Sequence, residues 1–142
     1  MPDWTHEKAV VGDGVAKWTI DKDNQLARYY DKNGKLLIVS PTATGLIPGD
    51  KHKEGDNKTP NGTYTLSSPE RGANKKGGRM SFGDYFYRTN HKNDSGGLSH
   101  VGIHGTGMPI FNGSKASHGC IRVDNRAIKK FHKVAPNNGA SS

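Results

Sequence analysis

Residues Gly102–Asn125 read GIHGTGMPIFNGSKASHGCIRVDN, and the interpretation of the whole chain starts from this stretch. It contains the only cysteine, Cys120, together with His104 and His118. A sole thiol among small polar residues, with a second histidine 120 − 104 = 16 positions upstream, is typical of a cysteine nucleophile whose base is supplied by the fold. We therefore interpret the rest of the chain as scaffold and substrate groove for this stretch.

A short strand and a helix are predicted on either side of the cysteine. Ser99–His104 alternates between apolar and polar residues, which predicts a strand with His104 at its end. Asp124–Val134 has helical spacing and begins with residues suited to N-capping. Because Cys120 then lies just before a helix N-terminus, we expect the helix dipole and unpaired N–H groups to lower the pKa of its thiol.

The rest of the chain is predicted to be mainly strands and turns. Asn33-Gly34 predicts a two-residue hairpin turn with positive φ at both positions. The polar residues 41–60 are predicted to form an ordered surface loop, and residues 69–79 a solvated loop or an electropositive rim above an anionic substrate. The predicted strands are Ala16–Ile20, residues 25–31, residues 35–40, a strand that follows Asn61, and Met80–Thr89 with its aromatic face.

Composition is consistent with one loop-rich, strand-rich domain over residues 1–142, and the predicted elements add one C-terminal helix. The net charge of +8 accounts for solubility or indicates an anionic partner, and charge alone does not choose among nucleic acid, an acidic membrane surface and an acidic cell-wall polymer. No apolar run is long enough to span a membrane, and Met1–Lys8 lacks the apolar core of a secretory signal. A cytoplasmic location, removal of a signal and another export route all remain open.

The central stretch contains the groups that acyl transfer through a thiol requires. His104 is placed to act as general base, and the backbone N–H groups of residues 118–120 can converge as an oxyanion hole, helped by the conformational freedom of Gly119. A zinc site made of His104, His118 and Cys120 is the alternative that these residue types leave open. We interpret His100 as structural and the other histidines as solvated surface residues: His6, His52, His91 and His132.

The pattern IHGT…SHGCIR resembles the signature of the L,D-transpeptidase catalytic domain (YkuD-like) family. His104 is followed by the twelve residues 105–116 and then by Ser117-His118-Gly119-Cys120-Ile121-Arg122. The segment Lys58-Thr59-Pro60-Asn61-Gly62-Thr63-Tyr64 also resembles the family's K-T-P-x-G-x-[FY] loop and strand. The sequence departs from the family at Ala127, where an Asp is usual, and after the helix, where a Gly-x-Pro-Val-type strand commonly follows.

The resemblance covers a core of about residues 16–135. It implies a mainly β fold, a β-sandwich with a helix packed beside the sheet, and a peptidoglycan L,D-transpeptidase without metal or organic cofactor. Cys120 would attack the carbonyl at the L-centre of diaminopimelate in a tetrapeptide stem and release D-alanine. An amine acceptor would give a 3→3 cross-link or D-amino acid exchange, and water would give L,D-carboxypeptidase activity. The residues that the resemblance assigns to catalysis are Cys120, His104, His118 and Gly119, and those it assigns to substrate binding are Arg122, Ser117, Gly105 and Thr106.

The expected partner is therefore the stem peptide of peptidoglycan, with no nucleic acid and no stable membrane insertion. The expected location is periplasmic or secreted, where the wall is accessible. An exported antibacterial effector, with an immunity protein as its partner, is a further hypothesis. The alternative function is a basic cell-wall-binding module that keeps the fold without catalysis.

Overall fold

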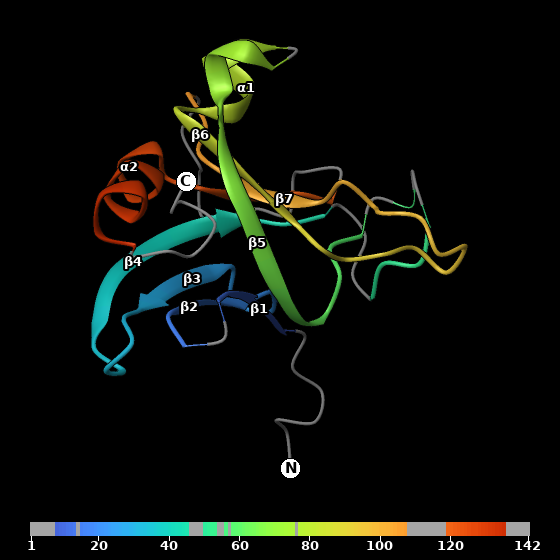
Figure 1. Cartoon of the computed structure of the whole chain (residues 1–142), viewed down its shortest axis with the longest axis horizontal. Coiled ribbons are helices and arrows are strands. Elements are labelled where there is room, and N and C mark those ends of the chain that lie inside the picture. Colours follow the sequence, from blue (N-terminus) through green and yellow to red (C-terminus); the bar gives the residue numbers. More distant parts are fainter. Residues whose placement is uncertain are drawn as a thin grey trace.

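The computed structural model describes residues 8–13, 15–45, 50–53, 56, 58–75, 77–107 and 119–135 (Figure 1). The elements in chain order are β1 Lys8–Gly12, β2 Lys17–Asp21, β3 Leu26–Tyr30, β4 Leu36–Ala43, β5 Gly62–Arg71, the 3-10 helix η2 Gly72–Asn74, α1 Gly78–Phe82, β6 Tyr85–Thr89, β7 Gly102–His104, β8 Ile121–Val123 and α2 Asn125–Val134. None of the helices in the described ranges is long and apolar enough to cross a membrane.

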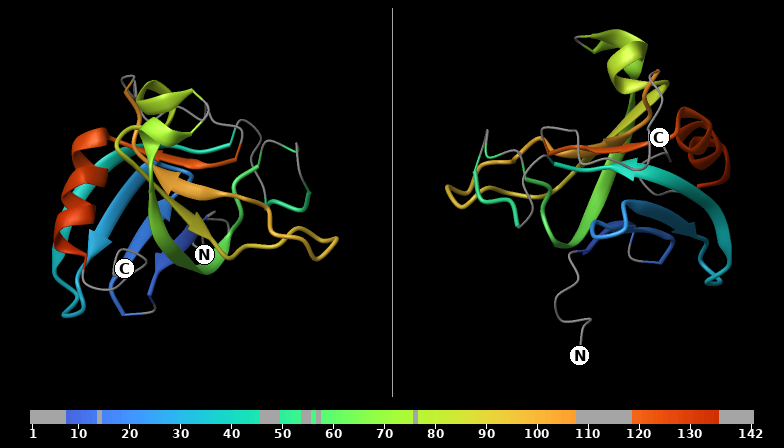
Figure 2. Two further views of the ribbon diagram at one scale, coloured as in Figure 1. Left: turned by 45° about the horizontal axis from the view of Figure 1, so that its top comes forward. Right: turned by 180° about the vertical axis from the view of Figure 1, so that it is seen from behind.

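The strands pair in a closed order, β1-β2-β3-β4-β8-β7-β6-β5, and β5 pairs with β1 to complete the circuit. The β1–β5 and β7–β8 pairs are parallel, and the other neighbours are antiparallel. The long strand β5 runs from the side of β1 to the side of β6, while α2 lies beside β4 (Figures 1 and 2). The predicted mainly β architecture with a C-terminal helix is confirmed. In addition, the β1–β5 pair closes the strands into a barrel, and the short helix α1 is an element that the sequence did not predict.

Strand β2 has the expected inward face, because Trp18 and Ile20 are fully buried. The hairpin β3–β4 that follows it also forms as predicted, but its turn differs. Of the Asn33-Gly34 pair, only Gly34 has a positive φ, at 81°. The Asp31 carboxylate accepts hydrogen bonds from the N–H groups of Asn33 and Lys35, so the loop is longer than the predicted two-residue turn.

The predicted strand Met80–Thr89 is wrong in its first half, where the chain forms α1 instead. The break falls at Gly83, whose φ of 64° is unfavourable for any residue with a side chain. A Cβ at Gly83 would also lie 2.3 Å from the side-chain oxygen of Asn125. Residues 69–71, predicted to be loop, belong to β5, and the strand β1 forms in a stretch that has no firm sequence pattern.

The core is closed by α2, which is predicted correctly. Its N-cap is Asp124, whose side chain accepts from the N–H of Arg126. Phe131 is fully buried against three aromatic rings from β2, β3 and β6, at centroid distances of 4.8–5.4 Å: Tyr87, Tyr29 and Trp18. Ala9 and Val11 of β1 belong to the same core. The division into a single domain over residues 1–142 stays a prediction.

Candidate active site

The parallel pair β7–β8 brings the histidine and the cysteine of the central stretch together. Ile103 is opposite Ile121, and both are buried in the core. Because side chains alternate along a strand, His104, Cys120 and Arg122 belong to the opposite face of the sheet. The N–H of Gly102 also hydrogen bonds to the Cys120 thiol, which places the sulfur against β7.

His104 is held as a neutral imidazole with a defined tautomer. Its side chain is buried, and Nδ1 lies 2.5 Å from the carbonyl oxygen of Gly105. A carbonyl only accepts, so Nδ1 carries the proton and Nε2 is the acceptor. Burial lowers the pKa of His104 to about 4, although the hydrogen bond to Gly105 acts to raise it. At neutral pH the imidazole is therefore a base that is ready to accept a proton.

The expectation of a lowered cysteine pKa is wrong. Burial raises the pKa of the Cys120 thiol, and this outweighs the hydrogen bond from Gly102 and the positive charges of Lys51, Arg122 and Lys75. The reason is structural, because β8 separates Cys120 from α2 and the first turn of α2 is capped by Asp124. The resting site thus holds a protonated thiol and a neutral imidazole.

Three further predicted residues surround this pair. Gly119 has a φ of 132°, and a Cβ there would lie 2.9 Å from the carbonyl oxygen of Lys58. A Cβ at Gly105 would lie 2.6 Å from the side-chain oxygen of Asn125. Glycine is therefore sterically required at positions 105 and 119. Thr106 is buried, and its hydroxyl donates to the carbonyl of Met80 in α1 at 3.3 Å.

Ser117 and His118 lie outside the described residues. Among the residues that are described, no group of three or more His, Cys, Asp or Glu side chains could hold a metal ion. The zinc alternative depends on His118, so it stays an untested hypothesis.

A cluster on the same face was missed in the sequence. Phe86 stacks on His104 at 5.7 Å, and Lys75 lies over the Phe86 ring at 4.4 Å. Glu70 binds Lys75 at 2.9 Å and Arg88 at 3.0 Å. Phe86 and Arg88 lie two residues apart on one face of the predicted strand Met80–Thr89, so the sequence could have identified them as neighbours. Lys75 could not be found in this way, because it is the C-cap of η2 in a stretch without periodicity. Its charge acts on both His104 and Cys120.

Two histidines predicted to be solvated are packed instead. His91 is buried, its Nδ1 lies 2.7 Å from the Ser99 hydroxyl, and its ring meets Tyr64 edge-on. His132 is half-buried and lies 3.0 Å from the Tyr87 hydroxyl. His52 is exposed as predicted, and His6 lies outside the described residues.

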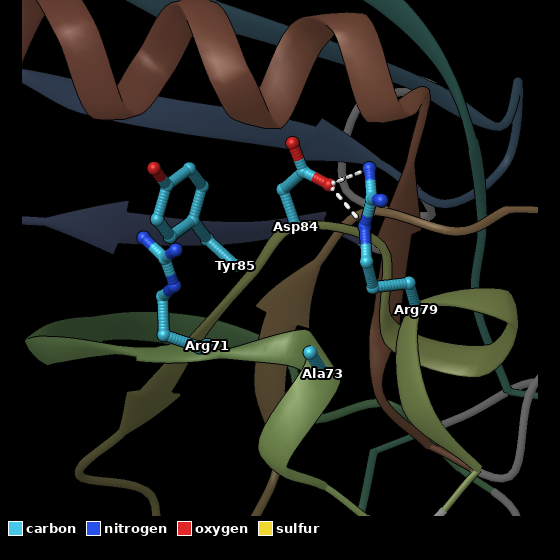
Figure 3. A pocket seen from close by; sticks show the side chains of 5 residues that line it. All are labelled: Arg71, Ala73, Arg79, Asp84 and Tyr85. Carbon is cyan, nitrogen blue, oxygen red and sulfur yellow. Dashed lines mark hydrogen bonds and ion pairs between the residues drawn. The ribbon is translucent and has the colours of Figure 1, made fainter.

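The side of β6 away from His104 carries two neighbouring cavities that share Tyr85, which we call the basic groove. One, of about 300 Å³, contains Tyr85, Arg71 and the Arg79–Asp84 ion pair (Figure 3). The other, of about 550 Å³, runs along α2, where Tyr85 stacks on His132 at 3.9 Å. The residues that line the groove are Arg71, Ala73, Arg79, Asp84, Tyr85, Lys129, Lys130, His132, Lys133 and Val134. Five Lys and Arg against one Asp give 5 − 1 = +4.

Comparison with known proteins adds a family to this geometry. The model of the L,D-transpeptidase catalytic domain family, YkuD, matches residues 17–139. The protein named "Putative L,D-transpeptidase YkuD" of Bacillus licheniformis is 28% identical over 118 residues, covering 83% of this chain and 59% of that protein. Its namesake in Bacillus subtilis is 29% identical over 105 residues, covering 74% of this chain and 52% of that protein. The chain thus spans little more than half the length of these curated relatives.

Solved structures show the same fold. The helical cell shape determining protein Pgp2 of Campylobacter jejuni superposes with a TM-score of 0.65 at 25% identity, covering 94% of this chain and 45% of that chain. L,D-transpeptidase 3 of Mycobacterium tuberculosis, solved with a faropenem-derived adduct, gives 0.58 at 16% identity, covering 95% of this chain and 58% of that one.

Proposed function

Because the chain belongs to the L,D-transpeptidase catalytic domain family, we propose that it is a cysteine acyltransferase that acts on peptidoglycan tetrapeptide stems. The observation that carries the proposal is the β7–β8 register, which puts the side chains of His104 and Cys120 on the same face of the sheet. A neutral base beside a protonated thiol supports general-base activation of the nucleophile.

The first half-reaction forms a thioester. As the Cys120 sulfur attacks the carbonyl carbon at the L-centre of diaminopimelate, the thiol proton passes to Nε2 of His104. The resulting imidazolium donates that proton to the amine of D-alanine as the carbon–nitrogen bond breaks. The Gly105 carbonyl stabilises the imidazolium through the Nδ1–H that it already accepts. The backbone N–H groups of His118, Gly119 and Cys120 are proposed as donors to the oxyanion.

In the second half-reaction His104 takes a proton from the acceptor, which attacks the thioester and releases Cys120 as a thiol. An amine acceptor forms a new peptide bond, whereas water gives a free carboxylate. Arg122 is proposed to bind a carboxylate of the stem, and Ser117, Gly105 and Thr106 are proposed to line the substrate site. No step in this scheme requires a metal or an organic cofactor.

The proposal is tested with tetrapeptide muropeptides and the purified protein. Release of D-alanine and formation of the tripeptide, both followed by mass, are expected with the native protein and not with Cys120→Ala. A carbapenem should add its mass to the native protein alone. If the native protein releases no D-alanine from muropeptides, with or without an amine acceptor, the proposed function is wrong.

The acid limb of the pH profile is expected near pH 4. With a pKa of about 4, His104 is almost fully neutral at pH 5.5, whereas a histidine of ordinary pKa 6.5 would be only about one-tenth neutral there. kcat/KM at pH 5.5 should therefore stay close to its value at pH 7, and the raised thiol pKa predicts no alkaline limb below about pH 9. Initial rates of D-alanine release between pH 3.5 and 9 locate the acid limb and show whether an alkaline limb is absent; an acid limb near 6.5 would contradict the neutral pair.

Protein stability needs a parallel measurement at acid pH. The folded pKa of His104 lies below the unfolded one, so between about 6.5 and 4 the unfolded chain binds more protons. The free energy of unfolding therefore decreases as the pH falls through this window. Returning acid-treated enzyme to pH 7 before assay separates loss of the base from unfolding.

A second candidate function, binding to the cell wall without catalysis, is favoured by the basic groove. The groove's charge of 5 − 1 = +4 complements the carboxylates of the stem peptide. The groove lies on the face of β6 opposite His104, because Tyr85 lines both of its cavities. Such a module would bind sacculi whether or not Cys120 is present.

Charge reversal in the groove is expected to weaken binding to sacculi about tenfold at low salt. The variant is Lys129→Glu/Lys133→Glu, and Lys32→Glu/Lys35→Glu in the exposed β3–β4 turn is the control with the same change in charge. Pelleting with purified sacculi, in a Cys120→Ala background, measures binding. Equal loss in both variants would show that net charge, rather than the groove, determines retention.

Two biological roles are proposed for the activity: a resident wall enzyme, or an exported effector that damages a rival's wall and is opposed by an immunity protein. Either role places the protein in the periplasm or outside the cell. Periplasmic expression in a susceptible bacterium separates them, because an effector lyses the cells through Cys120 and a resident enzyme leaves growth unchanged.

A further inference from the structure

Thr59 is buried between the polar loop before β5 and the turn that carries Cys120. Its side chain is fully buried. The hydroxyl accepts a hydrogen bond from the N–H of Gly45 at 2.8 Å and donates one to the carbonyl oxygen of Gly119 at 2.6 Å. A single side chain therefore ties the residue before the nucleophile to a segment 60 positions away in the sequence.

The hydrogen bond acts on the peptide plane that leads into the nucleophile. The Gly119 carbonyl lies in the same rigid plane as the Cα of Cys120, so holding the oxygen restricts where that Cα can lie. Gly119 itself supplies no restraint, since it lacks a side chain and has a φ of 132°. The close approach of the Lys58 carbonyl to Gly119 shows that the two segments are packed in direct contact.

Two buried lysines lie near this contact. Lys22 is 2% exposed, and its Nζ donates to the Thr59 carbonyl at 2.5 Å and to the Asn61 side chain at 2.9 Å. Lys51, 5% exposed, pairs with Asp56 at 2.9 Å, and its Nζ would lie 3.6 Å from a Cβ at Gly119. Buried ammonium groups are costly unless they are hydrogen bonded, so these contacts stabilise the described residues around Thr59.

Asp56 organises the same loop. Its carboxylate accepts from the N–H groups of His52, Lys53 and Lys58 as well as from Lys51. Burial acts to raise the pKa of Asp56, but these donors hold it well below its ordinary value. The carboxylate is therefore ionised throughout the working range of pH, and it keeps its hydrogen bonds to His52, Lys53 and Lys58.

We propose that Thr59 is a positioning residue for the nucleophile: its hydroxyl fixes the Gly119–Cys120 peptide and thereby the place of the Cys120 sulfur relative to His104. This inference deepens the proposed function and rests on it. A misplacement of about 1 Å is enough to cost about 10²-fold in rate, so a hydrogen bond that removes this freedom acts on kcat rather than on substrate affinity.

The test compares Thr59→Val with the loss of another buried hydroxyl. Tyr87 is also buried, and its hydroxyl lies 3.0 Å from Nδ1 of His132, on the face of β6 opposite His104. Thr59→Val is expected to lower kcat for D-alanine release about 10- to 100-fold with KM nearly unchanged. Thr59→Ser, which keeps the hydroxyl, should recover most of kcat. Tyr87→Phe should lower the melting temperature without this loss of kcat.

A substrate-independent measurement separates this inference from the proposed function. Alkylation of Cys120 by iodoacetamide reports its surroundings whether or not muropeptides are turned over. Loosening the turn in Thr59→Val should expose the thiol and increase its alkylation rate at pH 7, whereas Tyr87→Phe should match the native rate. If Thr59→Val equals Tyr87→Phe in both kcat and alkylation, the positioning role is wrong. If the native protein releases no D-alanine, the alkylation rates alone decide the inference.

Discussion

Replacing His104 with asparagine is expected to lower the rate of Cys120 acylation about 10²- to 10⁴-fold. The resting thiol has a raised pKa, so without a base almost no thiolate exists at neutral pH. Asparagine retains an N–H that can donate to the Gly105 carbonyl, and it removes the basic nitrogen that accepts the thiol proton. Single-turnover formation of the thioester, followed by intact mass, measures the effect.

His100→Asn is the matched control for this substitution. His100 lies on the same segment with a φ of 64°, which asparagine tolerates well, and its Nδ1 contacts Arg88 at 3.0 Å. We expect this variant to retain acylation within about twofold. Free imidazole should restore part of the activity to His104→Ala, since the buried site then has space for a base. Acylation by His104→Asn within a factor of ten of the native rate would contradict the role of His104.

The closeness of the candidate residues was largely predictable because they lie in one short stretch. His104 and Cys120 are only 16 positions apart, and the small residues around the thiol distinguish it from a core cysteine. Their environment was not predictable, because it depends on β8 as a partner of β7. The strand β8 has only three residues, and it removes Cys120 from the helix N-terminus that the sequence indicated. Burial then raises the thiol pKa instead of lowering it.

The fold was predictable where a pattern is local. The hairpin and α2 each follow from alternation or helical spacing over their own residues. By contrast, β1 is recognisable only from its partners, since it pairs with β2 on one side and with the distant β5 on the other. The loop around Thr59 is polar in sequence and was predicted to lie on the surface. Thr59 itself is nevertheless fully buried, with Lys22 hydrogen bonded to its carbonyl oxygen and Lys51 paired with Asp56 nearby.

Truncating Phe131 to alanine is expected to lower the free energy of unfolding by about 3–5 kcal/mol. The ring is fully buried where α2 meets the barrel, and it contacts Trp18, Tyr29 and Tyr87 at 4.8–5.4 Å. The substitution leaves a cavity and removes three edge-on aromatic contacts. At about 3–4 °C per kcal/mol for a chain of this size, the melting temperature should fall by roughly 10–15 °C.

The consequence extends from stability to the site, because α2 also holds the start of β6. Asn125 accepts a hydrogen bond from the N–H of Asp84 at 2.8 Å, beside Gly83 and Gly105. Loosening α2 therefore removes support from the Gly105 carbonyl that orients His104. Val134→Ala, on the exposed side of the same helix, should cost less than about 0.5 kcal/mol. Urea unfolding followed by far-UV circular dichroism compares the two variants, and equal destabilisation would show that Phe131 does not anchor the helix to the core.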